Sequence, residues 1–284
     1  MDQIYFGDNL TILKQLPSES VNLIYIDPPF NTGKQQKRTQ LKTTQVPDGD
    51  RVGFTGKRYK TIKLGTREYK DIFDDYIGFL EPRIIEAHRI LAQDGSFYFH
   101  IDYREVHYCK ILIDQIFGRD CFLNEIIWAY DFGGRSKKKW PTKHDNILVY
   151  VKDSRNYKFN SESVDRIPYM APGLVGPQKA AKGKLPTDTW WHTIVPTNSK
   201  EKTGYPTQKP TGIINRIIKA STEKHDLVLD FFAGSGTTGE CCWKLDRRFI
   251  LIDNNESAMQ IMAKRLCDHS SIEWLGFDPK PFQK

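Results

Sequence analysis

The sequence predicts an α/β protein built on an open, mostly parallel sheet that also contains an antiparallel hairpin. Residues 4–30 follow the order strand, helix, strand, and residues 227–253 repeat that order with a glycine-rich turn between the strand and the helix. Residues 126–130 and 147–151 have the apolar content of two more strands. Parallel strands need crossover connections, which are usually helices, whereas antiparallel strands can be joined directly. The alternation of strands and helices therefore favours a sheet with helices packed on it.

The first thirty residues place two aspartates where strands end. The first strand is expected over 4–6, and Asn9 is expected to cap a helix with three leucines on one face. The apolar, β-branched run at 21–26 ends in front of two prolines, which is typical of a buried strand that stops there. Asp8 and Asp27 therefore follow the carboxyl ends of strands, where open parallel sheets bind ligands.

The remaining elements follow from the same signals. Asp74 or Asp75 opens one helix, and Gly118 ends another. Strands are expected at 96–101, 126–130, 147–151, 227–229 and 249–252, and helices at 103–117 and 211–220. Only thirty-one residues follow Asp253, enough for a helix and a tail. The other strands of the sheet must therefore come from the amino-terminal part of the chain.

Composition limits the class of protein. The 284 residues are 39% hydrophobic, and a net charge of +7 with a pI near 9.0 favours a polyanionic partner. The five cysteines form no CxxC pair and no zinc-like spacing with histidine, so we expect reduced thiols and no metal. No secretion signal and no run of about eighteen apolar residues is present, which favours a cytoplasmic protein without membrane spans.

The tetrapeptide Asp27-Pro28-Pro29-Phe30 carries the first chemical signal. The Asp27 carboxylate can accept one N–H of an amino group, and the rigid turn at the prolines leaves a backbone carbonyl free to accept another. Phe30 offers an apolar face for a flat ring. The alternative is an ordinary Asp-Pro turn at the end of a strand.

A basic insert follows this tetrapeptide. Between Lys34 and Lys70 there are eleven lysines and arginines against three acidic residues, a net charge of +8. We expect a long loop at 31–70 that is mobile in the free protein and contacts phosphates through Lys34, Lys37 and Arg38. The alternative is a solvated flexible loop with no partner.

Residues 131–206 form a second variable region. The connector after the strand at 126–130 contains basic residues next to an aromatic one, a combination that suits phosphate contact and base stacking. Its candidate DNA-binding residues are Arg135, Lys137, Lys138, Lys139 and Trp140. Farther on, Trp190 and Trp191 either contact bases or pack the segment onto the core.

A second motif lies two hundred residues after the first. A strand leads into Asp230-Phe231-Phe232-Ala233-Gly234-Ser235-Gly236, a helix follows, and the next strand ends at Asp253. Glycines let a backbone approach a ligand, and a carboxylate at the tip of the second strand can accept ribose hydroxyls. Gly234-x-Gly236-x-x-Gly239 also satisfies the dinucleotide fingerprint, so a nicotinamide-dependent enzyme is a competing interpretation.

The order of these motifs resembles the β group of DNA amino-methyltransferases. That order is Asp-Pro-Pro-Phe, then a variable region, then Phe-x-Gly-x-Gly. Gly7-Asp8 near the start and Thr207-Gln208-Lys209-Pro210, which opens the helix before the glycine turn, also resemble the family. The resemblance covers nearly the whole chain except the basic insert. It implies a Rossmann-like methyltransferase sheet with a circularly rearranged motif order. The implied segments are 1–130 and 207–284 as halves of a catalytic domain, with 131–206 as a hairpin and target-recognition region.

The resemblance also implies roles for the residues. S-adenosylmethionine would be the cofactor, with Asp253 at its ribose, Asp8 at its adenine ring, and Lys209 with Pro210 beside its methionine end. Phe232, Gly234 and Gly236 would cradle its amino-acid part, and Asp230 and Ser235 of the same turn would also belong to the cofactor site.

The target and partners follow from the same resemblance. Asp-Pro-Pro-Phe inclines toward adenine N6 in duplex DNA, reached by flipping the base, with cytosine N4 as the alternative. A homodimer and a cognate restriction nuclease are further expectations. Outside this reaction class there are two alternatives, the nicotinamide-dependent Rossmann enzyme and a DNA-binding protein that has lost catalysis.

Overall fold

The computed structural model describes residues 1–31, 34–46, 48, 51–52, 58–71, 73–134 and 136–283. These residues form two compact units, one made of residues 1–30 and 75–284 and the other of residues 31–74. Among the described residues, no helix combines the length and the apolar composition that a membrane crossing requires.

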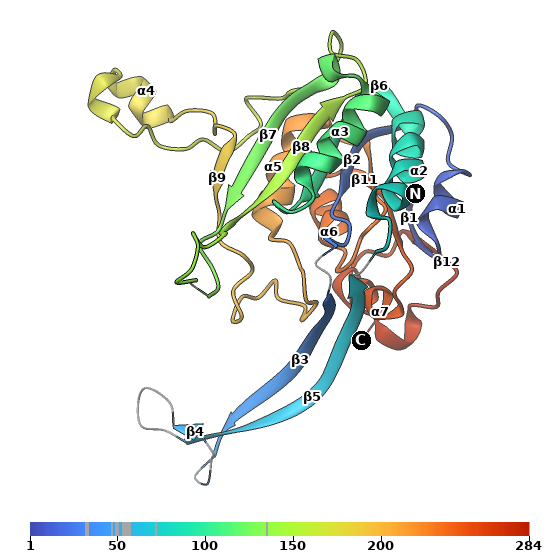
Figure 1. Ribbon diagram of the computed structural model, residues 1–284, viewed down its shortest axis with the longest axis vertical. Helices are drawn as coiled ribbons and strands as arrows, with labels where there is room; N and C mark the ends of the chain where they lie inside the picture. Colours follow the sequence, from blue (N-terminus) through green and yellow to red (C-terminus); the bar gives the residue numbers. More distant parts are fainter. Residues whose placement is uncertain are drawn as a thin grey trace. The chain divides into compact units, whose positions relative to one another are not determined.

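The larger unit is organised on a nine-stranded sheet (Figure 1). In the order in which they lie side by side, its strands are β12 (Ile272–Leu275), β1 (Asp2–Phe6), β11 (Arg248–Asp253), β10 (Leu227–Asp230), β2 (Val21–Ile26), β6 (Leu91–Ile101), β8 (His144–Val151), β7 (Phe122–Ala129) and β9 (Thr189–Trp191). Neighbours from β12 to β6 are parallel, and β8 runs antiparallel to both β6 and β7. The expected mixed sheet with one antiparallel hairpin is confirmed.

The two ends of the chain share the centre of this sheet. Strand β2 pairs with β10, and β1 lies between β11 and β12. The loops after β2 and β10 are therefore neighbours in space although about two hundred residues separate them. This is the arrangement that the rearranged motif order predicts.

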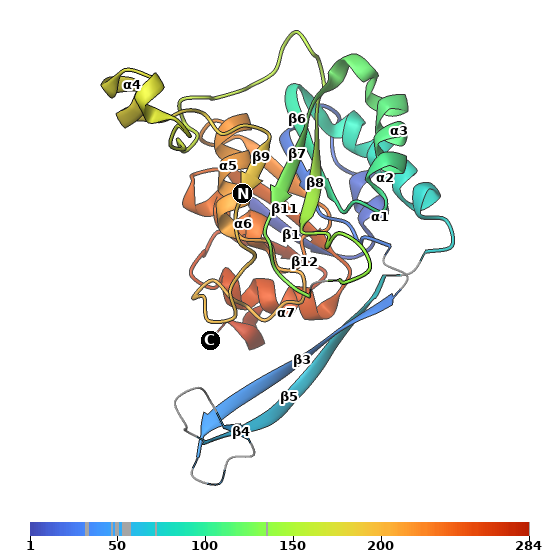
Figure 2. The ribbon, with the colours of Figure 1, turned by 60° about the vertical axis from the view of Figure 1, so that its left-hand side comes forward.

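Helices cover both faces of the sheet. Figure 2 shows α1 (Asn9–Leu13), α2 (Tyr76–Ile90) and α3 (Val106–Phe117) on one side, and α5 (Thr211–Ser221) and α6 (Thr237–Lys244) on the other. Helix α7 (Glu256–Arg265) follows β11. Isoleucines recur on α5 with helical spacing and are buried, namely Ile213, Ile214, Ile217 and Ile218. The core thus forms where such apolar stripes meet the buried strands.

Two boundaries differ from the sequence expectation. Asp8, not Asn9, caps α1, because its carboxylate accepts the backbone N–H of Thr11 at 2.9 Å while Asn9 turns its side chain into the protein and donates to the carbonyl of Phe231. The chain after Asp253 contains the strand β12 in addition to a helix. Its four residues, Ile272–Leu275, are too short a run to separate from a tail by periodicity.

The smaller unit corrects the expectation of an irregular loop at 31–70. Strands β3 (Lys34–Gln45) and β5 (Arg58–Asp71) form a long antiparallel pair, with β4 (Arg51–Val52) beside β5. The segment was expected to lack structure because it is polar and basic. Threonine, isoleucine and tyrosine in it favour strands, however, and two paired strands satisfy each other's backbone groups without an apolar core.

The variable region contributes to the sheet and also leaves it. Strand β9 adds to the edge beside β7, and Trp190 on it is buried, so this tryptophan packs against the core while Trp191 is 76% exposed. The short helices η2 (Pro172–Leu174) and α4 (Pro177–Lys182) precede β9, and both ribbon views show α4 standing away from the sheet (Figures 1 and 2). The division into segments 1–130, 131–206 and 207–284 stays a prediction.

Candidate active site

Five parallel neighbouring strands end at one edge of the sheet. Strands β1, β11, β10, β2 and β6 lie in that order, so the residues that end or follow them come together: Asp8, Asp253, Asp230, Asp27 and Asp102. Both predicted motifs, Asp27–Phe30 and the glycine turn, are therefore at the same edge. The topology brings together what the sequence keeps apart.

The Asp27 carboxylate divides its two oxygens between different environments. Its Oδ2 accepts from the ammonium of Lys209 in an ion pair. Its Oδ1 is buried and has no hydrogen-bond partner among the residues that the structure describes. A buried carboxylate oxygen without a donor is costly, so this atom is suited to accept a hydrogen bond from a ligand.

The rest of the tetrapeptide is held in place by the helix that follows. The Tyr76 hydroxyl at the start of α2 donates to the carbonyl of Pro29 at 2.6 Å, which fixes the turn. The Phe30 ring lies with its centroid 5.9 Å from that of His100 and 5.0 Å from the Lys209 ammonium. Phe30 is partly exposed, so one part of its ring is available for stacking.

His100 is a residue of this site that the sequence did not single out. It is fully buried at the end of β6, where the register of β2 and β6 sets it beside Asp27. Its Nδ1 is 2.9 Å from the Tyr25 hydroxyl and 4.0 Å from Asp27 Oδ1, and its Nε2 is 3.3 Å from Asp145 Oδ2. A polar residue at the end of an otherwise apolar strand was the available signal.

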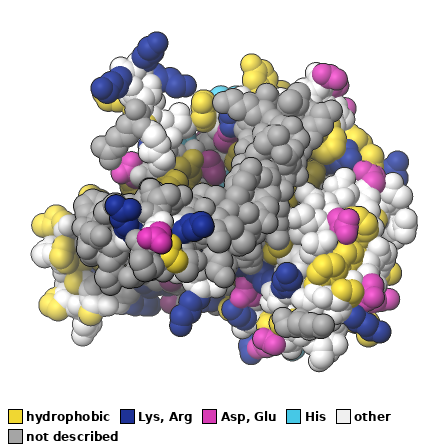
Figure 3. Space-filling view, turned by 90° about the horizontal axis from the view of Figure 1, so that it is seen from below, with side chains coloured by type: hydrophobic (Ala, Val, Ile, Leu, Met, Phe, Trp, Pro, Cys, Tyr) yellow, Lys and Arg dark blue, Asp and Glu magenta, His cyan; other side chains and the backbone are white. Residues whose placement is uncertain are grey.

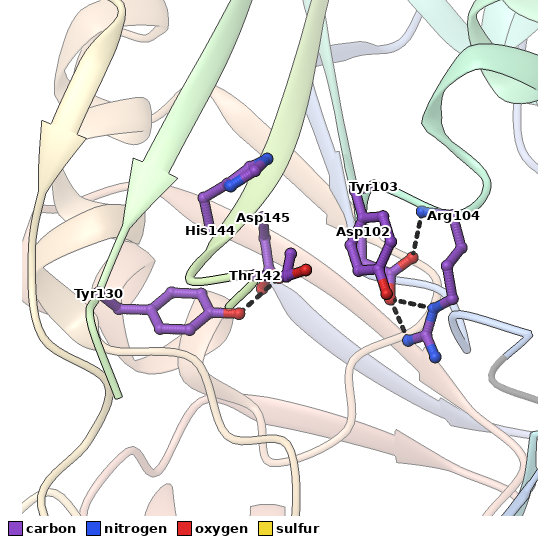
Figure 4. Close-up of a pocket in the computed structure, with 7 residues that line it drawn as sticks. All are labelled: Asp102, Tyr103, Arg104, Tyr130, Thr142, His144 and Asp145. Carbon is purple, nitrogen blue, oxygen red and sulfur yellow. Dashed lines mark hydrogen bonds and ion pairs between the residues drawn. The ribbon is translucent and has the colours of Figure 1, made fainter. Parts of the chain in front are cut away.

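Asp145 extends this polar group toward a pocket. Its second oxygen accepts from the Tyr130 hydroxyl at 3.2 Å. Burial alone would raise the pKa of Asp145, but hydrogen bonds and charge from His100, the charge of Lys209 and the Tyr130 hydroxyl hold that pKa below its ordinary value. Figure 4 shows Tyr130 pointing at Asp145 across a pocket of about 160 Å³ that Asp102, Tyr103, Arg104, Thr142 and His144 also line.

The glycine turn is built on a buried carboxylate. Asp230 accepts the Thr238 hydroxyl at 2.6 Å and the backbone N–H of Phe232 at 3.1 Å, so its side chain closes the turn on itself. Burial, opposed by these two hydrogen bonds, raises the pKa of Asp230 to about 7. Both of its oxygens have partners within the turn, and its contact with a cofactor stays a prediction.

The two glycines of the turn have left-handed backbone torsions, with φ of 51° at Gly234 and 71° at Gly236. A Cβ at Gly236 would lie 2.7 Å from Cγ of Met262 on α7, and one at Gly234 would lie 3.0 Å from the Tyr205 ring. Both positions therefore exclude larger residues through the protein's own packing. The sequence had assigned this requirement to the approach of a ligand.

Asp253 supports the turn from the neighbouring strand. One of its oxygens accepts the N–H of Gly234 at 2.7 Å and the other accepts that of Asn255 at 2.8 Å. Burial raises the pKa of Asp253 to about 6, although these backbone donors act in the opposite direction. The carboxylate thus joins the glycine turn to the start of α7 at the position expected for a ribose contact.

Ser235 is buried and bonded within the protein. Its hydroxyl lies 3.1 Å from that of Thr237, and its carbonyl accepts from Arg265 on α7 at 3.2 Å. Arg265 also forms an ion pair with Glu240 on α6. These bonds fix the shape of the turn.

Asp8 has partners on both sides. Besides capping α1, it forms a 3.2 Å ion pair with Arg83, whose guanidinium lies 3.9 Å from the Phe79 ring centroid. Phe79 in turn lies 6.1 Å from Phe232, so the predicted adenine and amino-acid positions are linked by aromatic contacts. Pro210 precedes α5, and the Lys209 carbonyl accepts from Thr237 at 3.3 Å.

The candidate DNA-binding residues of the connector that the structure describes are exposed. Lys137, Lys138 and Lys139 are solvent-accessible, and Trp140 is 93% exposed. The Lys139 ammonium is 5.9 Å from the Tyr103 ring, so the connector reaches the pocket of Figure 4. Arg135 lies outside the described residues.

The basic residues of the insert are placed by backbone only. Lys34, Lys37 and Arg38 lie on β3, where Lys34 is opposite Asp71, Lys37 opposite Glu68 and Arg38 opposite Arg67. On the face in Figure 3, the lysines and arginines that are drawn in colour are interspersed with acidic side chains and form no continuous patch. The described side chains on that face therefore give no single phosphate-binding track.

Comparison with known proteins identifies the family. The family described as DNA methylase (N6/N4) matches residues 21–264. The DNA adenine methyltransferase YhdJ of Escherichia coli (strain K12) is 32% identical over 287 residues, which cover 96% of this chain and 85% of that protein.

Two solved structures share the fold. The M1.HpyAVI–SAM complex has a TM-score of 0.59 at 22% identity and covers 94% of this chain and 99% of its own. The cytosine-N4-specific PvuII DNA methyltransferase has a TM-score of 0.63 at 16% identity and covers 99% of this chain and 90% of its own. The predicted methyltransferase sheet and family are confirmed: because the family match spans most of the chain, the protein belongs to the N6/N4 DNA methylases.

Proposed function

We propose that this DNA methylase transfers the methyl group of S-adenosylmethionine to N6 of adenine in duplex DNA. The observation that carries the proposal is Asp27 Oδ1, a buried acceptor without a partner among the described residues, at the sheet edge that also holds the glycine turn. An amino group is the donor that such an atom lacks.

S-adenosylmethionine is the methyl donor of this family. In the proposal, Phe232, Gly234 and Gly236 flank its amino-acid part, and the carboxylates of Asp253 and Asp8 lie where ribose and adenine are expected. Both carboxylates keep acceptor capacity, since each oxygen can take a second hydrogen bond. Lys209 and Pro210, proposed beside the methionine end, adjoin the turn through the bond from Thr237.

The methyl transfer needs an oriented nucleophile. Asp27 Oδ1 and the Pro28 carbonyl would accept the two N–H groups of the target amine, which directs the nitrogen lone pair at the methyl carbon. Lys209 holds the other oxygen of Asp27, so the carboxylate cannot turn freely. Phe30 would stack on the flipped base. Positioning and electrostatics then lower the barrier.

Adenine is favoured over cytosine by two observations. The motif begins with aspartate, which inclines toward adenine N6, and the relative that is 32% identical is named a DNA adenine methyltransferase. Cytosine N4 is the second candidate, since the family includes both targets and the PvuII enzyme has the same fold.

Product analysis separates the two candidates. Duplex DNA from a host without methylation would be incubated with the protein and S-adenosylmethionine, digested to nucleosides and measured by mass spectrometry. We expect N6-methyladenine. N4-methylcytosine would reverse the target assignment, and no methylated nucleoside would contradict the proposed activity altogether. Methylation-sensitive sequencing of the same DNA gives the recognition sequence.

We also propose that the connector at 131–144 and the antiparallel pair β3–β5, called the basic hairpin below, contact DNA. Trp140 and the three lysines before it would meet bases and phosphates from the exposed connector, and the basic residues of β3 and β5 would meet phosphates. A homodimer and a cognate restriction nuclease complete the proposal. Sedimentation of the free and DNA-bound protein tests the dimer.

The register of the basic hairpin supplies a matched test of phosphate binding. In the backbone register, Arg38 lies opposite Arg67, and Lys37 lies opposite Glu68. Replacing both arginines with glutamine should flatten the slope of log affinity against log salt by roughly 0.9 for each phosphate that the protein no longer neutralises. Lys37→Gln removes one charge in place of two and is the comparison with a smaller expected change. Equal slopes in all variants would show that the hairpin does not bind phosphates.

A further inference from the structure

The site contains a buried group that the methyl transfer proposed above leaves unused. His100 lies between two carboxylates, with Nε2 at 3.3 Å from Asp145 Oδ2 and Nδ1 at 4.0 Å from Asp27 Oδ1. The side chain of His100 has no exposed surface, and Asp27 and Asp145 are nearly buried as well. Such a line of titratable groups behind a substrate-facing atom is suited to proton movement.

The contacts of the imidazole fit one tautomer. Burial, together with the neighbouring Asp27 carboxylate, raises the pKa of Tyr25 well above its ordinary value, so its hydroxyl keeps its proton and can donate it to Nδ1 of His100 at 2.9 Å. In the tautomer that pairs with this donor, Nε2 carries the hydrogen and donates to Asp145. Nδ1 then presents its lone pair on the side of the ring where Tyr25 and Asp27 lie.

We infer that His100 takes up, through Asp27, the proton that the target amine releases, and that Asp145 stabilises the resulting imidazolium. The inference rests on the proposed function. As the nitrogen–methyl bond forms and the carbon–sulfur bond breaks with its electron pair going to sulfur, the amine nitrogen loses one proton. That proton passes to Asp27 Oδ1 and then to Nδ1, while the Tyr25 hydroxyl turns from donating to accepting.

The geometry allows each step of this path. Asp27 Oδ1 needs a shift of about 1 Å to reach hydrogen-bond distance from Nδ1, and such contacts commonly tighten when substrate binds. Tyr130 holds the second oxygen of Asp145, which keeps that carboxylate aimed at the ring. After the products leave, the proton returns through Asp27 to water. His100 and Asp145 are thus positioning residues that act through Asp27, as a buried aspartate acts through histidine in other sites.

The test uses the full-length protein, S-adenosylmethionine and duplex DNA under single-turnover conditions. Asp145→Asn keeps an acceptor for Nε2 but removes the charge that stabilises the imidazolium. We expect methyl transfer to slow by about 10²-fold, the lower end of general-base effects, with cofactor and DNA affinities unchanged. We also expect a larger solvent deuterium isotope effect than in the wild type, because proton removal becomes slower than methyl transfer.

A matched control and a second variant make the test decisive. Asp114 accepts from Tyr150 at 2.7 Å as Asp145 does from Tyr130, but it lies on α3 away from the site, so Asp114→Asn should keep the wild-type rate. His100→Gln should repeat the loss, and it carries the test if Asp145→Asn does not fold.

The outcomes separate this inference from the proposed function. Wild-type rates in both variants would overturn the inference, and so would slow variants whose isotope effect is unchanged, since these indicate a structural role. In either case, methylation by the wild type that Asp27→Ala abolishes would leave the proposed function standing.

Discussion

The carboxylates of Asp27 and Asp253 end two strands at the same sheet edge and differ in how far the protein itself uses them. Asp253 accepts a backbone N–H on each oxygen, from Gly234 and from Asn255. Asp27 gives one oxygen to Lys209 and leaves the other without a partner among the described residues. The Asp253 carboxylate is bonded within its own loop, whereas the Asp27 carboxylate keeps one acceptor oxygen that we propose for a ligand.

This difference has a physical cost that indicates function. A fully bonded carboxylate stabilises its loop, whereas an unpartnered buried oxygen loses hydration with no protein donor in return. Such an atom persists where a ligand supplies the missing donor. We therefore propose substrate contact for the β2 loop, and a structural role for the carboxylates of the β10 and β11 loops in addition to any contact with the cofactor. Each proposal can be tested by mutation.

The largest expected effect is that of Asp27→Ala. Removing the acceptor should slow methyl transfer by at least about 10²–10³-fold, as loss of one preorganised group at a reacting centre does, with S-adenosylmethionine affinity within about twofold of the wild type. Single-turnover methylation and calorimetry measure the two quantities. Asp165→Ala, which removes an ion pair with Arg216 elsewhere, is the control. Substantial turnover by the Asp27 variant would show that Asp27 has no role in the methyl transfer.

Lys209→Met should have a smaller effect of the same kind. The Lys209 side chain is 11% exposed and bonds Asp27, so its loss frees the carboxylate to turn. We expect roughly 10-fold slower methyl transfer, the size of one charge-assisted hydrogen bond. Lys158→Met, which breaks a comparable pair with Asp226, should leave the rate unchanged. A main loss in cofactor affinity instead would favour the contact with the methionine end that the sequence predicted.

Asp253→Ala should destabilise the loop rather than affect the methyl transfer directly. Two backbone N–H groups would lose their acceptor, which costs on the order of 1–3 kcal/mol for each buried group left unpaired. We expect weaker S-adenosylmethionine binding together with a lower melting temperature, measured by calorimetry. Asp253→Asn, which keeps one acceptor oxygen, should have an affinity and a melting temperature between those of the wild type and Asp253→Ala. Weaker binding at unchanged stability would mean that Asp253 acts as a ligand contact alone.

The sequence predicted the parts of this site whose residues lie close together in the chain. Asp27–Phe30 follows an apolar strand, and the glycine turn lies between a strand and a helix, so pattern and turn chemistry were enough. The pairing of Lys209 with Asp27 joins residues 182 positions apart, and His100 meets Asp145 across two strands. Such contacts depend on strand order and register, which periodicity does not contain.

The basic hairpin at 34–71 is a case in which the sequence contained the signal but the interpretation of that signal was wrong. Its lysines and arginines suggested a solvated loop, yet the alternative of two strands was also present in its threonine and β-branched residues. Charge and strand propensity are separate properties, because side chains on a two-stranded ribbon can remain in water while the backbone pairs. Whether a basic segment is a loop or a ribbon is therefore decided by its backbone pairing, not by its charge.

The smallest effect, that of Asp230→Asn, concerns pH. The folded pKa of Asp230, about 7, is above its ordinary value of 3.8, so the folded state holds this proton more tightly than the unfolded chain. The contribution to stability is complete below about pH 4 and is lost as pH rises through about 7.

Between pH 6 and pH 8, this loss is on the order of 1 kcal/mol, or about 2–4 °C in melting temperature. In Asp230→Asn, the amide can donate to Thr238 and accept from Phe232, as the protonated acid does, so the variant should fold and lose most of this pH dependence. Thermal melts of both proteins across that range measure the difference. Parallel curves would show that Asp230 keeps its charge state on unfolding, and its burial would then not affect the pH dependence of stability.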